Sequence, residues 1–287
     1  LDCHADNVPK DLRGKDFVLE DGVGCEACHG GAGGADGRSG WIRSHALDTV
    51  SHAQNVENGL RALDRPAVRA SRCLDCHLGN ESQFVSHRIM GAGHPRISFE
   101  LDTFTQVEPA HYRVDDDYRA RGKETPSHAQ VWAVGQAVAS QRTLELLEDP
   151  EVGRAGVWPE YVFFDCYACH HAISDLRWQP RAGQGLEGAP GVARLDDAHL
   201  LMLRRALDVV APESAPELGR ATLGLHAAYS RGTESTARAV RAASSVVASS
   251  LPAVESWQPS AAQVKSLASG LARDAAAGYF RDYSGAE

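Results

Sequence analysis

The cysteines constrain this chain more than any other feature, because all seven belong to one short pattern, C-x-x-C-H. Three copies are complete: Cys25-Glu26-Ala27-Cys28-His29, Cys73-Leu74-Asp75-Cys76-His77 and Cys166-Tyr167-Ala168-Cys169-His170. The seventh cysteine, Cys3, is followed by His4, and the tetrapeptide that ends there repeats residues 74–77 letter for letter. The sequence therefore begins one residue inside a fourth copy.

The spacing within the pattern has a mechanical reason. Two thiols about one helical turn apart can form thioethers with the vinyl groups of a haem, and the histidine that follows then reaches the iron. Four copies predict at least four covalently bound haems of c type. A zinc ribbon needs no histidine at this position, a redox dithiol would occur once, and disulfides would leave the histidines unexplained. Zinc is the main alternative.

The pattern assigns a role to each of its members. The thioether cysteines are Cys3, Cys25, Cys28, Cys73, Cys76, Cys166 and Cys169, and the proximal iron ligands are His4, His29, His77 and His170. Thirteen histidines are present against only two methionines, so a second histidine is expected on most irons. Ligation by two histidines implies low midpoint potentials.

We predict His45, His87, His94 and His171 as the distal ligands. His87 and His94 lie in a glycine-bounded stretch just after the third motif. His171 points roughly 100° away from His170 on a helix, so it can reach only a neighbouring iron. His128, His52 and His111 are weaker candidates, and His199 and His226 fit ordinary packing or surface roles on C-terminal helices.

The chain is expected to be mainly α, with two parts. Residues 1–180 carry one motif per roughly 40 residues, too little chain for a core of its own, so short helices and loops should pack around the haems. A longer helix is predicted from Ser127, whose Ser127-His128-Ala129-Gln130 run has the form of a capping box. After a Gly/Pro-rich connector over residues 179–193, residues 195–287 should form a bundle. Its four expected helices cover residues 200–210, 218–227, 233–250 and 260–279.

Charge and hydropathy limit the kinds of partner and the cellular locations that are expected for the chain. The formal net charge is −9, which argues against nucleic acid and favours a redox partner protein with a basic docking face. No run of residues approaches the length of a membrane span, so an integral membrane protein is not expected. Haem c is attached outside the cytoplasm, so the chain is expected in the periplasm, outside the cell or on its surface.

The run Gly22-Val23-Gly24-Cys25-Glu26-Ala27-Cys28-His29-Gly30 resembles the cytochrome c-554 family, tetrahaem carriers that accept electrons during hydroxylamine oxidation. Residues 92–101 and 158–171 resemble larger multihaem relatives, and the similarity extends over residues 1–180. The resemblance implies a further C-x-x-C-H upstream, hence five haems in the intact protein, with His45 serving the first. It also implies an open coordination position on the His4 haem.

The sequence thus predicts a multihaem c-type cytochrome that passes single electrons between redox partners. Two alternatives stay open. One is a haem enzyme in which an open iron, that of His4, acts on a small nitrogen or oxygen compound. The other is self-assembly of subunits into an oligomer or an extracellular conductive filament, through heterologous contacts that do not close on themselves.

Overall fold

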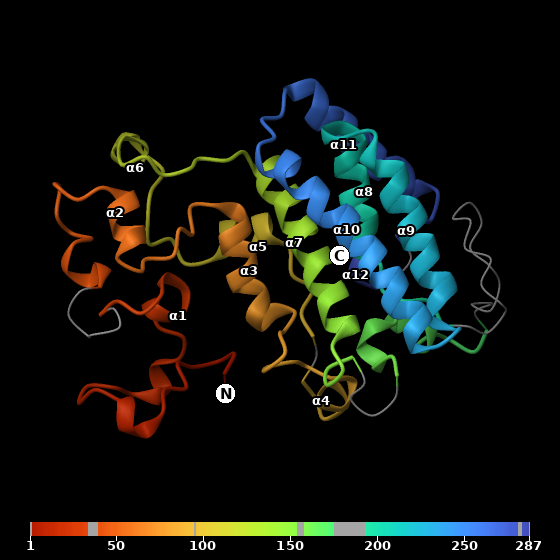
Figure 1. Ribbon diagram of the computed structural model, residues 1–287, viewed down its shortest axis with the longest axis horizontal. Coiled ribbons are helices and arrows are strands. Elements are labelled where there is room, and N and C mark those ends of the chain that lie inside the picture. Colours follow the sequence, from red (N-terminus) through yellow and green to blue (C-terminus); the bar gives the residue numbers. More distant parts are fainter. Residues whose placement is uncertain are drawn as a thin grey trace.

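The computed structural model describes residues 2–33, 40–94, 96–153, 158–174, 193–280 and 283–286. This part of the chain is built from α-helices and short 3-10 helices (Figure 1), and its one isolated β-bridge joins Phe164 and Leu195. The mainly α fold predicted from the sequence is confirmed. Apart from Ala193, the predicted connector over residues 179–193 lies outside the described residues.

The N-terminal half contains only short helices, as predicted, until α7 begins. In Figure 1, α1, α2 and α6 lie well away from the long helices, on stretches of irregular chain. Some of these elements begin at a side-chain cap, such as the Ser51 capping box of α2 and the Ser86 cap of α4. They are η1 (Lys10–Leu12), η2 (Leu19–Asp21), α1 (Cys25–His29), η3 (Trp41–Arg43), α2 (His52–Glu57), α3 (Pro66–His77), α4 (His87–Gly91), α5 (Leu101–Val107) and α6 (Asp116–Ala120), and the two short elements η4 (Tyr161–Phe163) and η5 (Cys166–Ala168) follow α7.

Long helices pack side by side in the other half (Figure 1). They are α7 (His128–Glu148), α8 (Ala198–Val210), α9 (Ser214–Tyr229), α10 (Thr233–Glu255), α11 (Ala261–Ala276) and the short α12 (Tyr283–Ala286). The four predicted C-terminal helices are present, although α10 continues through Pro252 beyond its expected end. Helix α7 packs against α8 and α10, so the bundle also includes a helix from the motif-bearing half.

The caps of α7 and α11 show how tertiary contacts change a local motif. At α11, Ser260 and Gln263 make both bonds of the capping box. At α7, the Ser127 side chain accepts from the Gln130 backbone N–H, but the reciprocal bond is missing. The Gln130 side chain donates instead to the carbonyl of Glu255 at the end of α10. The residue expected to close the cap therefore joins two bundle helices.

Apolar burial is concentrated in the bundle. Its core is lined by α7 to α11 and extends to Leu74 and Leu78 at the end of α3 and to Phe163 in η4. By contrast, the described residues before Ala70 bury only Ala5, Ala32, Trp41 and Pro66 among apolar side chains. Side-chain packing alone does not give this segment a core, and the prediction that haem provides it stays a prediction.

No helix in the described part of the chain has both the length and the apolar character needed to cross a lipid bilayer.

A charged cluster fastens the third motif to the bundle. Asp75, inside that motif, accepts from Arg142 Nη1 of α7 at 3.0 Å and from Arg72 Nη1 at 2.8 Å. Arg142 also donates to the carbonyl of Gly79 at 2.9 Å. Burial raises the pKa of the Asp75 carboxyl, but the hydrogen bonds outweigh that effect and the net pKa lies below its ordinary value. Folding therefore favours the ionised carboxylate.

We expect Arg142→Met to lower the free energy of unfolding by about 1.5–3 kcal/mol at pH 7, since hydrogen bonds to a charged group are lost. Folding lowers the pKa of Asp75, so this contribution is present above the ordinary carboxyl pKa of about 4 and is lost as the pH falls through the lower folded value. Urea titrations at pH 7 and pH 3 measure the difference. Arg241→Met, which removes an exposed pair with Glu148, is the control and should cost under about 1 kcal/mol. If Arg142→Met lowers the free energy of unfolding equally at pH 7 and pH 3, the ionised Asp75 carboxylate is not the group that Arg142 stabilises.

Candidate haem-binding and metal-ligating site

Each complete motif lies at or within a short helical turn. Cys25–His29 is the whole of α1, Cys73 to His77 form the last turn of α3, and Cys166 begins η5. Gly30, directly after α1, has φ +88°, and a Cβ there would lie 2.9 Å from the carbonyl oxygen of Gly59. The chain can therefore turn sharply after His29 only because glycine follows it.

The thiols have the environment of groups that do not ionise readily. All seven are free of disulfides. Burial raises the pKa of the Cys28, Cys76 and Cys166 thiols, and raises that of Cys73 to about 11. Redox-active dithiols and reactive cysteines have a lowered pKa. These four thiols therefore do not match the redox-dithiol alternative.

Thiols of different motifs lie next to each other. The Cys76 thiol is close enough to Cys3 for the two to interact, although they are far apart in the sequence. Cys28 is close enough to Cys73 and Cys76 to interact with them electrostatically. The motifs ending at His4, His29 and His77 are therefore gathered in one region.

Three motif histidines face a second histidine. The His4 and His94 rings have centroids 5.8 Å apart, and their Nε2 atoms are 3.5 Å apart. The His29 and His111 centroids are 6.1 Å apart, and those of His170 and His87 are 6.0 Å apart. Each pair thus joins a motif to a residue distant in the sequence.

The spacing of these pairs fits two axial ligands of one metal ion. Bonds from imidazole nitrogen to a metal are about 2.0–2.1 Å long, which places the two nitrogens about 4 Å apart and the ring centroids about 6 Å apart. All three pairs have about that centroid distance. The Nε2 atoms of His4 and His94 are 3.5 Å apart, about half an ångström closer than two such bonds predict. The histidines therefore fit axial ligation of haem iron.

Backbone carbonyls orient several of the other rings. Nδ1 of His111 lies 3.1 Å from the carbonyl oxygen of Pro109, and Nδ1 of His45 lies 2.8 Å from that of Ile42. His171 Nδ1 is 2.8 Å from the carbonyl oxygen of Ala172. An N–H donated from Nδ1 fixes the tautomer and leaves Nε2 available to a metal, as is common for ligating histidines. The contacts of His45, His111 and His171 are compatible with this arrangement.

The four predicted distal ligands divide into two groups. His87 and His94 face motif histidines, whereas His45 and His171 make no ring contact with one. His45 packs edge-on against Trp41, with centroids 5.4 Å apart, and Trp41 in turn contacts His29 at 6.3 Å. His45 therefore lies near the second motif without facing its histidine.

His111 is a weaker candidate from the sequence, and the structure places its ring against that of His29. It lies between α5 and α6 in a stretch without periodicity, and only the fold brings it to His29. The other two weaker candidates contact carboxylates: His128 Nδ1 lies 3.0 Å from Asp102 and His52 Nε2 lies 2.9 Å from Asp64. His226 Nε2 lies 3.0 Å from Asp197 and His199 Nδ1 lies 2.9 Å from Gln136, which is compatible with the packing roles expected for them.

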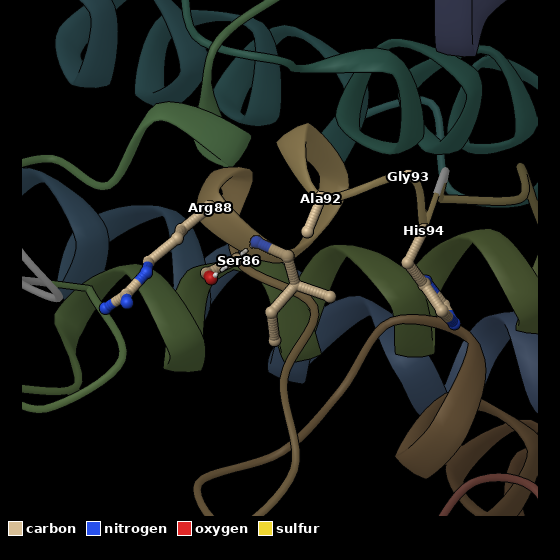
Figure 2. Close-up of a pocket in the computed structure, with 6 residues that line it drawn as sticks. Ser86, Arg88, Ala92, Gly93 and His94 are labelled. Carbon is tan, nitrogen blue, oxygen red and sulfur yellow. Dashed lines mark hydrogen bonds between the residues drawn. The ribbon is translucent and has the colours of Figure 1, made fainter.

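A pocket of about 530 Å³ borders His94 (Figure 2). In Figure 2, the His94 imidazole and the Arg88 guanidinium lie at opposite ends of the pocket, with Ser86 and Ala92 between them. An apolar surface bounded by an imidazole and a cation suits a porphyrin, which has apolar faces and anionic propionates. Together with the ring spacing, this pocket shows that the residues present fit haem.

The tetrahedral zinc alternative needs four ligands at one point. Among the described residues, which include all the cysteines and histidines, no three or more His, Cys, Asp or Glu side chains are arranged to hold a metal ion.

The family model described as cytochrome c554 and c-prime matches residues 1–30. This stretch contains the partial motif at Cys3 and the complete motif of α1. No curated protein and no solved structure matches the chain. The family match supports a c-type cytochrome with covalently bound haem.

Proposed function

We propose that this chain is a multihaem c-type cytochrome that passes single electrons along closely packed haems between redox partner proteins. The observation that carries this proposal is the set of three histidine pairs, each of which combines a motif histidine with a second histidine at the spacing of two axial ligands. In such a protein, bound haem supplies an iron that alternates between the ferric and ferrous states. The chain fixes the position and the environment of each haem.

The thiol contacts support close packing. Because Cys76 interacts with both Cys3 and Cys28, the haems at His4 and His29 would both adjoin the haem at His77. The haem at His170 joins this group through one short segment. That segment carries His87, which faces His170, and seven residues later His94, which faces His4. The spatial order we propose is His29, His77, His4, His170.

The polypeptide also sets the potentials. Two neutral imidazoles on an iron favour low potentials, and haem burial and nearby charges adjust them further. Two further contacts hold the proposed ligand His87 in place. Its backbone N–H donates to Glu160 at 2.8 Å, and the Tyr161 ring packs edge-on against its imidazole. Fixed ligands limit the structural change that accompanies each electron.

The acidic chain suggests a partner with a basic docking surface. Because haem c is attached outside the cytoplasm, we propose a periplasmic, extracellular or cell-surface location.

Replacing His111 tests the ligand assignment. We expect His111→Gln to convert one haem from low to high spin and to raise its midpoint potential by on the order of 0.1 V, because axial ligands shift haem potentials over several tenths of a volt. Electron paramagnetic resonance and a spectroelectrochemical titration measure these changes.

His52→Gln is the matched control for this experiment. Its amide can still donate to Asp64, so every spin state and potential should be unchanged. An unchanged spectrum in His111→Gln, or an equal change in both variants, would show that His111 is not an iron ligand.

A further inference from the structure

Two arginine residues bond the last three carbonyl groups of the second motif. The Ala27 carbonyl accepts from Arg72 Nε and, at 2.7 Å, from Arg61 Nη1. Arg61 Nη1 also donates to the Cys28 carbonyl at 3.1 Å, and the Arg61 backbone N–H donates to the His29 carbonyl at 2.9 Å. The last carbonyls of a helix have no partner within that helix. Residues outside α1 therefore supply the bonds that complete it.

Arg72 is also bonded to the third motif. It lies in α3 directly before Cys73, and its Nη1 donates to Asp75 Oδ2 at 2.8 Å. One guanidinium therefore bonds a carbonyl of the second motif and a carboxylate of the third, although Ala27 and Arg72 are 45 residues apart in the sequence. The planar fork of arginine presents several N–H donors in fixed directions, which suits it to hold two acceptors at once.

The charge of Arg72 acts on a thiol in each of these motifs. Burial raises the pKa of the Cys28 thiol and of the Cys76 thiol, and the Arg72 charge opposes that effect at both. Glu108 acts against Arg72 at Cys28. The Arg72 and Asp75 side chains are only 30% and 22% exposed, so solvent and salt screen their charges less than those of surface groups. The guanidinium is therefore an effective positive charge between two haem-binding motifs.

We propose that Arg72 is a positioning residue for electron transfer, which fixes the second motif beside the third and raises the midpoint potentials of the haems bound there. This role rests on the proposed multihaem function. A nearby positive charge favours the ferrous state, because reduction removes one unit of positive charge from the iron. The two-ended bond of Arg72 keeps both haems at one spacing, and the rate of electron tunnelling between them depends on that spacing.

The first measurement is a spectroelectrochemical titration of the purified holoprotein that carries Arg72→Met. At a fixed potential, we expect the ratio of ferrous to ferric iron to fall by about 3- to 10-fold at two haems and to stay unchanged at the others, as for one unit charge acting over roughly 10 Å near a protein surface. This corresponds to a fall in midpoint potential of roughly 30–60 mV, since a tenfold change is about 59 mV for one electron.

The second measurement separates the bond from the charge. The magnetic interaction between ferric haems, observed by electron paramagnetic resonance, depends on their spacing and orientation. Arg72→Met and Arg72→Lys should both weaken it, because neither side chain has the fork that holds the carbonyl and the carboxylate together. Arg72→Lys keeps the positive charge, so its ferrous-to-ferric ratios should stay within about 2-fold of the wild-type values.

Arg65→Met is the matched control. Arg65 lies directly before α3, its side chain is 54% exposed, and its Nε is 3.6 Å from Glu124. This substitution also removes one positive charge from the same helix, but it breaks no contact with a motif. We expect it to leave both the midpoint potentials and the magnetic interaction unchanged.

The inference is overturned if Arg72→Met leaves either the midpoint potentials or the magnetic interaction unchanged, or if Arg65→Met changes them equally. A wild-type magnetic interaction in Arg72→Lys would show that the two-ended bond does not position the haems. If Arg72→Met does not fold, Arg72→Gln, which keeps an N–H donor without the charge, gives the same two measurements. In each case covalent haem remains and the proposed carrier stands, whereas a purified wild-type protein without covalent haem removes the proposed function itself.

Discussion

The double variant Cys25→Ser with Cys28→Ser is expected to lose one haem and to unfold much of the segment before Ala70. The described residues of that segment bury only Ala5, Ala32, Trp41 and Pro66 among apolar side chains. Burial of a side chain such as leucine or valine stabilises a fold by about 1.5–3 kcal/mol, so two alanines, a proline and one tryptophan cannot order a segment of this length. Haem lost from α1 therefore removes the main source of burial there.

Hydrogen exchange measured by mass spectrometry resolves this effect along the chain. Amides of α1, η3 and α2 should exchange rapidly in the double variant, whereas those of α8 to α10 should remain protected as in the wild-type protein. Native protection of α1 and α2 after loss of the haem would show that the polypeptide supplies its own core.

The second large effect is expected in the bundle. Leu203 of α8 is fully buried in the main core, and Leu203→Ala should lower the free energy of unfolding by about 2–5 kcal/mol through lost burial and the cavity left behind. The number of haems should not change. Urea unfolding followed by far-ultraviolet circular dichroism measures the stability, and optical spectra of the unfolded protein measure the haem content.

Leu223→Ala is the matched control, because Leu223 lies on α9 with 37% of its surface exposed. We expect a change within about 0.5 kcal/mol, as for most surface substitutions. Equal losses in the two variants would mean that α8 does not face the core. Loss of a haem from Leu203→Ala would mean that the bundle is required for haem binding.

Local signals in the sequence were sufficient for the motifs and for the long helices. The C-x-x-C-H pattern depends only on residues within one turn, and caps such as Ser127 and Ser260 are also local. Periodic leucines located α8 and α9. By contrast, the end of α10 was placed too early, because Pro252 is tolerated within that helix.

The axial pairs could not be predicted in the same way, because each depends on chain segments far apart in the sequence. His87 and His94 were chosen for their place near a motif, and the structure brings them to His170 and His4. His111 has no local signal, and only the fold brings it to His29.

The role of α7 is a further property of the tertiary structure. Its sequence predicted a helix in the motif-bearing half, but its residues are buried against α8 and α10. Arg142 then connects the same helix to Asp75 in the third motif. The two predicted parts of the chain therefore share a helix.

The intact mass of the purified, denatured protein, measured after treatment with a thiol-alkylating reagent, tests the central claim most directly. Covalent attachment at every motif predicts the chain mass plus four haems, with no alkylated cysteine, since all seven thiols would be thioethers. A mass equal to that of the chain alone with its cysteines alkylated would contradict the account. This holds whether or not the native protein contained zinc.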